Sequence, residues 1–142
     1  VDLVREQICV AHGDKIFTNQ ENIKPLGHSI ECRINAESSE DFKPSAGKIE
    51  MYHPPAGNGI RLDTFIYSGY KVPHYYDNLL AKLISTGRTR NHAIKRALRS
   101  LNEIVIDGID TNIELHKKIL SSPEFKNGGV AINWLENNIE KL

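Results

Sequence analysis

The sequence has little of several features that would assign a protein class directly. Its 142 residues include two cysteines, Cys9 and Cys32, one tryptophan and one methionine. Two cysteines without C-x-x-C spacing exclude a disulfide scaffold and a zinc ribbon. We therefore expect two buried free thiols in a reducing compartment, the cytoplasm. No apolar run approaches the ~20 residues of a membrane helix, and no signal-peptide pattern opens the chain, so no membrane association is expected.

The sequence also has no excess of one charge. Eighteen Lys and Arg residues balance eighteen Asp and Glu residues, and the pI is about 7.2. A nucleic-acid-binding domain needs a basic excess to attract the phosphate backbone, so no nucleic-acid partner is expected. The hydrophobic fraction of 39% and the charged fraction of 25% are those of one ordinary globular domain.

An amphipathic helix is predicted at the very start of the chain, over residues 2–12. Asp2 can cap it and Gly13 can end it. Because Val1 is not an initiator methionine and a helix follows without a lead-in, we expect a piece of a longer protein; a processed N-terminus is the alternative. Residues 13–27 are predicted to be a connector with at most a short strand.

From residue 28 the apolar residues alternate, which predicts strands over 28–36, 48–51 and 60–66. A fourth strand over 79–86 is apolar on both faces, so it should be central. Helical spacing follows over 94–104, with Thr89 near its start. Strands followed by helices predict an α+β fold, an antiparallel sheet with helices packed on one face.

Further helices are predicted toward the end of the chain. Thr111 and Glu114 form a T-x-x-E capping box, so Thr111 should cap a helix. One or two helical turns are expected around residues 131–139. His116 lies on the apolar face of the first of these helices, and the prediction is a hydrogen-bonded core histidine rather than a metal ligand.

Standard catalytic motifs are absent from the sequence. It contains no phosphate-binding loop, dinucleotide-binding glycine motif, H-E-x-x-H or G-x-S-x-G, and no histidine pair with metal-ligand spacing. No metal site is therefore predicted in this chain.

One segment that could carry chemistry is residues 31–37. Its polar face places Glu31, Arg33, Asn35 and Glu37 in a row. Arginine keeps its charge and offers a planar fork of donors, which suits an oxyanion, and the carboxylates could fix its orientation. A solvated strand face is the alternative.

Two other segments stand out. Residues 67–77 carry four tyrosines before the central strand and are either a binding surface or a loop packed on its own sheet. Residues 127–134 combine two glycines with Trp134, and a turn that packs the tail on the domain is the simpler interpretation.

Five motifs, in order, resemble the C-terminal domain of biotin carboxylase over essentially the whole chain. They are GHSIECRINAE (27–37), PSAGKI (44–49), GIR (59–61), YYD (75–77) with KLI (82–84), and DG (107–108) with TN (111–112). By this resemblance, residues 1–26 are the end of the preceding ATP-grasp domain and a connector, and residues 27–142 are the C-terminal domain.

The resemblance implies a ligase that uses ATP and bicarbonate to carboxylate biotin held on a biotin carboxyl carrier protein. It also implies Mg²⁺ or Mn²⁺, with ligands in the upstream domains, and carboxyltransferase subunits as partners. Since those upstream domains supply the ATP and bicarbonate residues, the isolated chain is expected to be inactive.

The resemblance also implies roles for five residues. Arg33 would hold the ureido oxygen of biotin as a catalytic residue, and Asp77 would orient an arginine at the biotin site. Ile132 would pack on the adenine ring of the nucleotide. Arg61 and the preceding Asn58 would lie at a homodimer interface, although Asn58 replaces an aromatic found in some relatives.

The parent enzyme expected from the resemblance is a bacterial-type acetyl-CoA carboxylase of fatty acid biosynthesis. The same subunit of a pyruvate or other acyl-CoA carboxylase is the alternative, because this domain does not touch the acyl acceptor. An autonomous protein-interaction module that uses the tyrosine loop is a rival from another class.

Overall fold

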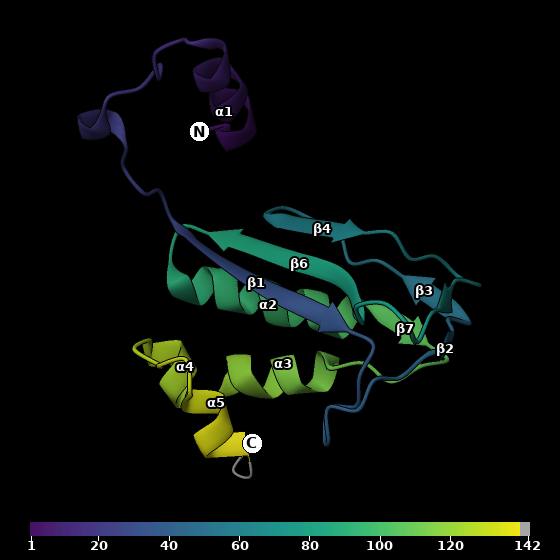
Figure 1. Ribbon diagram of the computed structural model, residues 1–142. Helices are drawn as coiled ribbons and strands as arrows, with labels where there is room; N and C mark the ends of the chain where they lie inside the picture. Colours follow the sequence, from purple (N-terminus) through teal and green to yellow (C-terminus); the bar gives the residue numbers. More distant parts are fainter. Residues whose placement is uncertain (140–142) are drawn as a thin grey trace.

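The computed structural model describes residues 1–139, and Figure 1 shows an N-terminal segment beside a body of strands and helices. In the N-terminal segment, α1 (Leu3–His12) and the short 3-10 helix η1 (Gln20–Asn22) lie away from the sheet. As predicted, Asp2 caps α1 and Gly13 ends it, in the left-handed conformation with φ of 101°. Within the described part of the chain, α1 buries no side chain.

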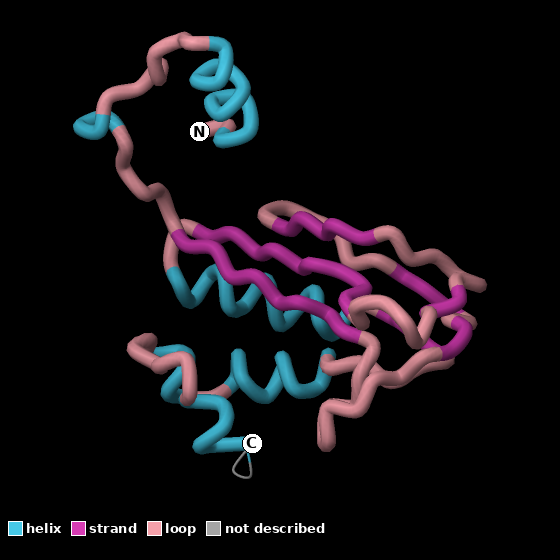
Figure 2. Tube along the Cα trace, viewed as in Figure 1, coloured by secondary structure: helices cyan, strands magenta, loops and turns pink. Residues whose placement is uncertain are grey.

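A three-stranded antiparallel sheet forms the centre of the body, in the order β1-β6-β4 (Figure 2). β1 (His28–Asn35) pairs with β6 (Leu79–Gly87), which pairs on its other side with β4 (Ile60–Thr64). β6 is therefore the central strand, as its apolar residues predict.

Two small ladders extend one end of this sheet (Figure 1). β2 (Gly47–Lys48) pairs with β5 (Lys71–Val72), and β3 (Met51–His53) pairs with β7 (Val105–Asp107). The prediction of one strand over 48–51 is wrong, because the chain changes pairing partners within that stretch.

The helices of the body lie on one face of the sheet, as predicted (Figure 1). α2 (Arg90–Glu103) packs across β1 and β6, and α3 (Ile113–Ser121) packs beside α2 and against β1. Thr89 caps α2 by accepting a hydrogen bond from a backbone amide. α4 (Pro123–Asn127) and α5 (Trp134–Asn138) complete the described chain.

The hydrophobic core lies between the sheet and these helices. Alternate residues of β1 point into it, β6, α2 and α3 supply many others, and Ile49 and Ile66 come from the segments between the shorter strands. Its members include Ile30, Cys32, Ile34, Ala81, Leu83, Ile94, Ala97, Leu101 and Leu120. Burying aliphatic side chains of this size stabilises the fold by roughly 1.5–3 kcal/mol each. This core makes β1 and β6 a rigid base for the side chains on the opposite face.

The capping box predicted at Thr111 is wrong. The N-cap residue of α3 is Asn112, whose side chain makes no capping bond. The carbonyl of Thr111 accepts a hydrogen bond from Ser39 Oγ (2.9 Å). The side chain of Asn112 instead bonds β1, so a tertiary contact replaces the local one.

Across residues 1–139, none of the helices combines the length and apolar character that crossing a membrane would require.

Candidate functional site

Arg33 is exposed on β1, on the sheet face that α2 and α3 leave uncovered. Its neighbours Cys32 and Ile34 point into the core. Lys82 of β6 lies opposite it in the register, and Asp63 of β4 lies opposite Lys82. Over the described residues the guanidinium of Arg33 forms no ion pair. It is therefore available to a ligand that carries or develops negative charge.

The expectation that carboxylates fix the Arg33 guanidinium is wrong for Glu37. Glu37 accepts hydrogen bonds from the side-chain amides of Asn35 (3.2 Å), Asn78 (2.7 Å) and Asn112 (3.0 Å). Its carboxylate thus joins the end of β1 to the start of β6 and to α3.

The main chain of Arg33 is held at the outer edge of β1. Its carbonyl accepts hydrogen bonds from Asn112 Nδ2 (3.1 Å) and from His116 Nε2 (2.9 Å). Since a carbonyl only accepts, Nε2 of His116 carries the proton. Burial lowers the pKa of His116, and the bond to Arg33 opposes this shift. The predicted hydrogen bond of His116 is confirmed, but the histidine is half-buried beside β1 and is not a core residue.

Asp77 lies just before β6 and is exposed. Its Oδ1 accepts a hydrogen bond from the amide of Leu79 (2.8 Å), which fixes the entry of the chain into β6. In the described chain it forms no ion pair. Tyr75 and Tyr76 beside it are also exposed, and their rings contact each other at 5.0 Å between centroids.

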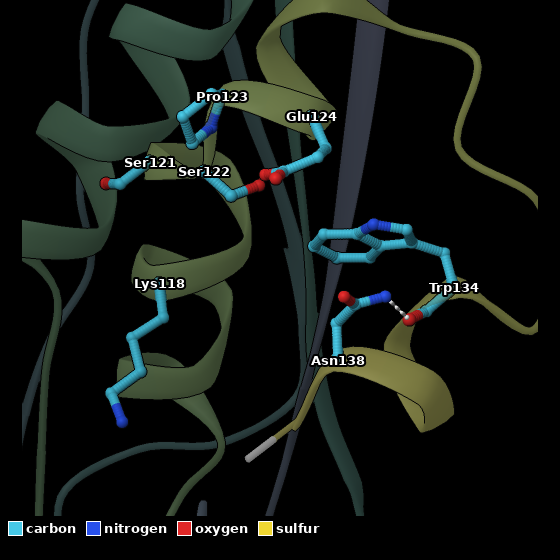
Figure 3. A pocket seen from close by; sticks show the side chains of 7 residues that line it. All are labelled: Lys118, Ser121, Ser122, Pro123, Glu124, Trp134 and Asn138. Carbon is cyan, nitrogen blue, oxygen red and sulfur yellow. Dashed lines mark hydrogen bonds between the residues drawn. The ribbon is translucent and has the colours of Figure 1, made fainter. Parts of the chain in front are cut away.

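The C-terminal tail carries an exposed apolar residue and, two residues later, a tryptophan that lines a pocket. The side chain of Ile132 is 102% exposed. Two residues later, the indole of Trp134 faces a pocket of about 430 Å³ between α5 and the α3–α4 junction (Figure 3). Asn138 Nδ2 donates to the carbonyl of Trp134 (2.8 Å) and holds α5 together. Trp134 is half-buried and lines this pocket without joining the hydrophobic core, so the predicted packing of the tail on the domain is only partial. Ile132 lies clear of the core.

Arg61 lies on β4, at an edge of the sheet. Its guanidinium donates two hydrogen bonds of 2.8 Å to the carboxylate of Asp63, two residues along the same strand. These bonds lower the pKa of Asp63. Asn58 is exposed in the turn before this strand.

The two cysteines differ in their surroundings. Burial raises the pKa of the Cys32 thiol to about 12. Cys9 on α1 is partly exposed, so the prediction that both thiols are buried is wrong for Cys9. Among residues 1–139, no group of three His, Cys, Asp or Glu side chains could hold a metal ion.

Sequence reasoning did not find the residues that hold Arg33 in place. Asn112 is 79 positions from Arg33 and His116 is 83 positions away. The only signal for Asn112 is its place in one of the five motifs, which carries no information about its partner.

Comparison with known proteins places the chain in a family. Residues 31–137 match the family model of the biotin carboxylase C-terminal domain. The chain is 50% identical to the biotin carboxylase of Haemophilus influenzae over 139 residues, which are 98% of this chain and 31% of that protein. It thus spans about 30% of the length of the curated relatives that it matches.

Solved structures give the same result. A Campylobacter jejuni biotin carboxylase–βγ-ATP complex matches 96% of this chain with 30% of its own, at a TM-score of 0.89 and 42% identity. A second match is the biotin carboxylase domain dimer of Hydrogenobacter thermophilus 2-oxoglutarate carboxylase, in complex with ADP and bicarbonate. It matches 99% of this chain with 31% of its own, at a TM-score of 0.91 and 39% identity. Since the family model matches residues 31–137 and the fold and sequence agree with those of biotin carboxylases, this chain belongs to the biotin carboxylase C-terminal domain family.

Proposed function

We propose that this chain is the C-terminal part of an ATP-dependent ligase that carboxylates carrier-bound biotin with bicarbonate. The observation that carries the proposal is Arg33, a cation without an ion pair in the described chain, held on a strand that is anchored on both sides. Relatives of this chain are named biotin carboxylase, and they are about three times its length.

The proposed role of Arg33 is to stabilise the charge that develops on biotin. Removal of the ureido proton places negative charge on the ureido oxygen, and the guanidinium would donate to that oxygen. A fixed donor aimed at developing charge is worth about 2.7–4 kcal/mol in comparable oxyanion sites. Asp77 would support this site by orienting an arginine, while it also fixes the entry into β6.

Ile132 would pack against the adenine ring of ATP. A fully exposed isoleucine two residues before the half-buried Trp134 offers an apolar surface without removing a side chain from the core. One structural relative is a complex with a βγ-ATP ligand and another contains ADP.

The residues of this chain do not fit Mg²⁺ or Mn²⁺, because residues 1–139 contain no cluster of metal-ligating side chains. We therefore assign no metal-dependent step to this chain, and we propose that the metal ligands lie in the upstream domains. We also propose a domain boundary: residues 1–26 would end the preceding ATP-grasp domain, and residues 27–142 would form the C-terminal domain.

The proposed partners are a second copy of the enzyme, a biotin carboxyl carrier protein and carboxyltransferase subunits. The H. thermophilus relative is a dimer, and Arg61 and Asn58 lie exposed on and beside the edge strand β4, where a second copy would bind. The acceptor would be acetyl-CoA in fatty acid biosynthesis, in the cytoplasm. A 2-oxo acid, as named for the H. thermophilus relative or in a pyruvate carboxylase, is the second candidate.

The test is Arg33→Ala in the full-length parent protein. We expect biotin carboxylation to fall about 10²–10³-fold, because one oxyanion donor is lost, while ATP binding is retained. Lys95→Ala, which removes an exposed cation from α2, is the matched control and should leave the rate unchanged. Unchanged biotin carboxylation in the Arg33→Ala variant would show that Arg33 is a solvated strand residue.

A second measurement concerns the isolated 142-residue chain. We expect no bicarbonate-dependent ATP hydrolysis from it, since the residues proposed to bind ATP phosphates lie outside it. Turnover above the background of a mock purification would contradict the proposal.

A further inference from the structure

The outer edge of β1 is closed by the side chain of one asparagine. Asn112, at the start of α3, is 5% exposed. Its Oδ1 accepts a hydrogen bond from the backbone amide of Asn35 (3.0 Å), and its Nδ2 donates to the backbone carbonyl of Arg33 (3.1 Å). These are the two bonds, one accepted and one donated, that a further strand would form with this edge. The amide group of Asn112 thus replaces a neighbouring strand at Arg33.

Two more hydrogen bonds reinforce this closure. The backbone amide of Asn112 donates to the carbonyl of Asn35 (3.3 Å), and His116 Nε2 donates to the carbonyl of Arg33 (2.9 Å). On its other side β1 is paired with β6. The main chain that carries Arg33 is therefore held from both sides.

Every polar atom of the Asn112 amide is used. Nδ2 donates its second hydrogen bond to Glu37 Oε1 (3.0 Å). The carboxylate of Glu37 also accepts hydrogen bonds from the side-chain amides of Asn35 and Asn78. Hydrogen bonds to a carboxylate are about twice as strong as neutral ones. Glu37 therefore fixes the orientation of the Asn112 amide, and Asn112 in turn fixes β1.

We propose that Asn112 is a positioning residue for Arg33, with Glu37 and His116 as its supports. This inference rests on the proposed function of Arg33. Asn112 acts through the main chain: without its side-chain amide, the outer edge of β1 at residues 33–35 loses two hydrogen bonds. A displacement of about 1 Å in a reacting group can cost up to ~100-fold in rate.

The experiment uses the full-length parent enzyme with Asn112→Ala. We expect the kcat of biotin-dependent carboxylation to fall about 10–100-fold. The loss in biotin-independent, bicarbonate-dependent ATP hydrolysis should be much smaller, because that reaction does not need Arg33. The KM for ATP should change less than the biotin-dependent kcat.

Ser39→Ala is the matched control. Ser39 Oγ donates to the carbonyl of Thr111 (2.9 Å), so this variant also removes a side-chain bond to the segment before α3, without touching β1 at Arg33. A folded Asn112→Ala enzyme with normal biotin-dependent turnover would overturn the proposal. The proposal would also be overturned if Asn112→Ala and Ser39→Ala both lowered carboxylation and bicarbonate-dependent ATP hydrolysis by the same factor.

Arg33→Ala, measured beside Asn112→Ala, separates this proposal from the proposed function. If Arg33→Ala leaves carboxylation unchanged, the proposed function fails. If Arg33→Ala loses it and Asn112→Ala does not, only the positioning role fails. In the double variant we expect no loss beyond that of Arg33→Ala, since both changes act through one group.

A milder variant keeps the test decisive if Asn112→Ala does not fold. His116→Phe retains a ring but removes one of the two donors to the carbonyl of Arg33. We expect the biotin-dependent kcat to fall by about 2–5-fold. This loss should be selective, like that of Asn112→Ala, but smaller. A proportional loss of both reactions in His116→Phe would also contradict the positioning role.

Discussion

The N-terminal helix α1 and the central strand β6 differ in what surrounds their apolar side chains. Ile8 of α1 is 66% exposed, whereas Leu83 of β6 is 0% exposed. Both elements are regular, and α1 has a side-chain cap and a glycine stop. Local regularity and burial are therefore separate properties. The sheet and its helices form a self-contained core, to which α1 contributes little.

The largest expected effect is the loss of a core side chain. Leu83→Ala should lower the free energy of unfolding by about 2–5 kcal/mol, because it removes buried methyl groups and leaves a cavity. Ile8→Ala, a change of similar size on α1, should alter it by no more than about 0.5 kcal/mol. Urea unfolding of the two variants measures both values. Equal destabilisation would show that α1 is part of the cooperative core.

Thiol reactivity sharpens the same comparison. A thiol reacts as the thiolate, and with the Cys32 pKa at about 12 only on the order of one molecule in 10,000 is ionised at pH 8. Raising the pH to 9 should therefore leave Cys32 protected. Titration of the native chain with a thiol reagent should modify Cys9 quickly, and Cys32 only after denaturant is added. Rapid modification of both in the native chain would mean that the core opens readily.

The smallest expected effect comes from the helix caps. Thr89→Ala removes the cap of α2 and should cost about 1 kcal/mol of unfolding free energy, because α2 packs on the sheet. Asp2→Ala removes the corresponding cap of α1. It should reduce helical circular dichroism slightly without moving the unfolding midpoint. A shift of that midpoint by Asp2→Ala would contradict the separation of the two regions.

Much of the fold could be predicted from the sequence. The alternation of residues 28–36 predicts β1, and the apolar run of 79–86 predicts a central strand, because side chains on a strand alternate with a period of two. The short elements β7 and α4 were missed, since three to five residues carry too little periodicity to be recognised.

The candidate site was only partly predictable. The pattern places Arg33 on the exposed face of β1, and the structure confirms this placement. The predicted roles of Arg33, Asp77, Ile132, Arg61 and Asn58 stay predictions. The bonds from Asn78 and Asn112 to Glu37 could not be foreseen, because these donors lie 41 and 75 positions away in the chain.

The sequence by itself determined which side chains of β1 face the core, where α2 begins, and which family the motifs resemble. These are local properties, set by backbone geometry and by residue type at fixed spacing. Only the tertiary structure decided that α1 stays exposed, that Thr111 caps nothing, and that Asn112 closes the edge of β1 at Arg33. Burial and hydrogen-bond partners depend on segments far apart in the chain, and no local pattern encodes them.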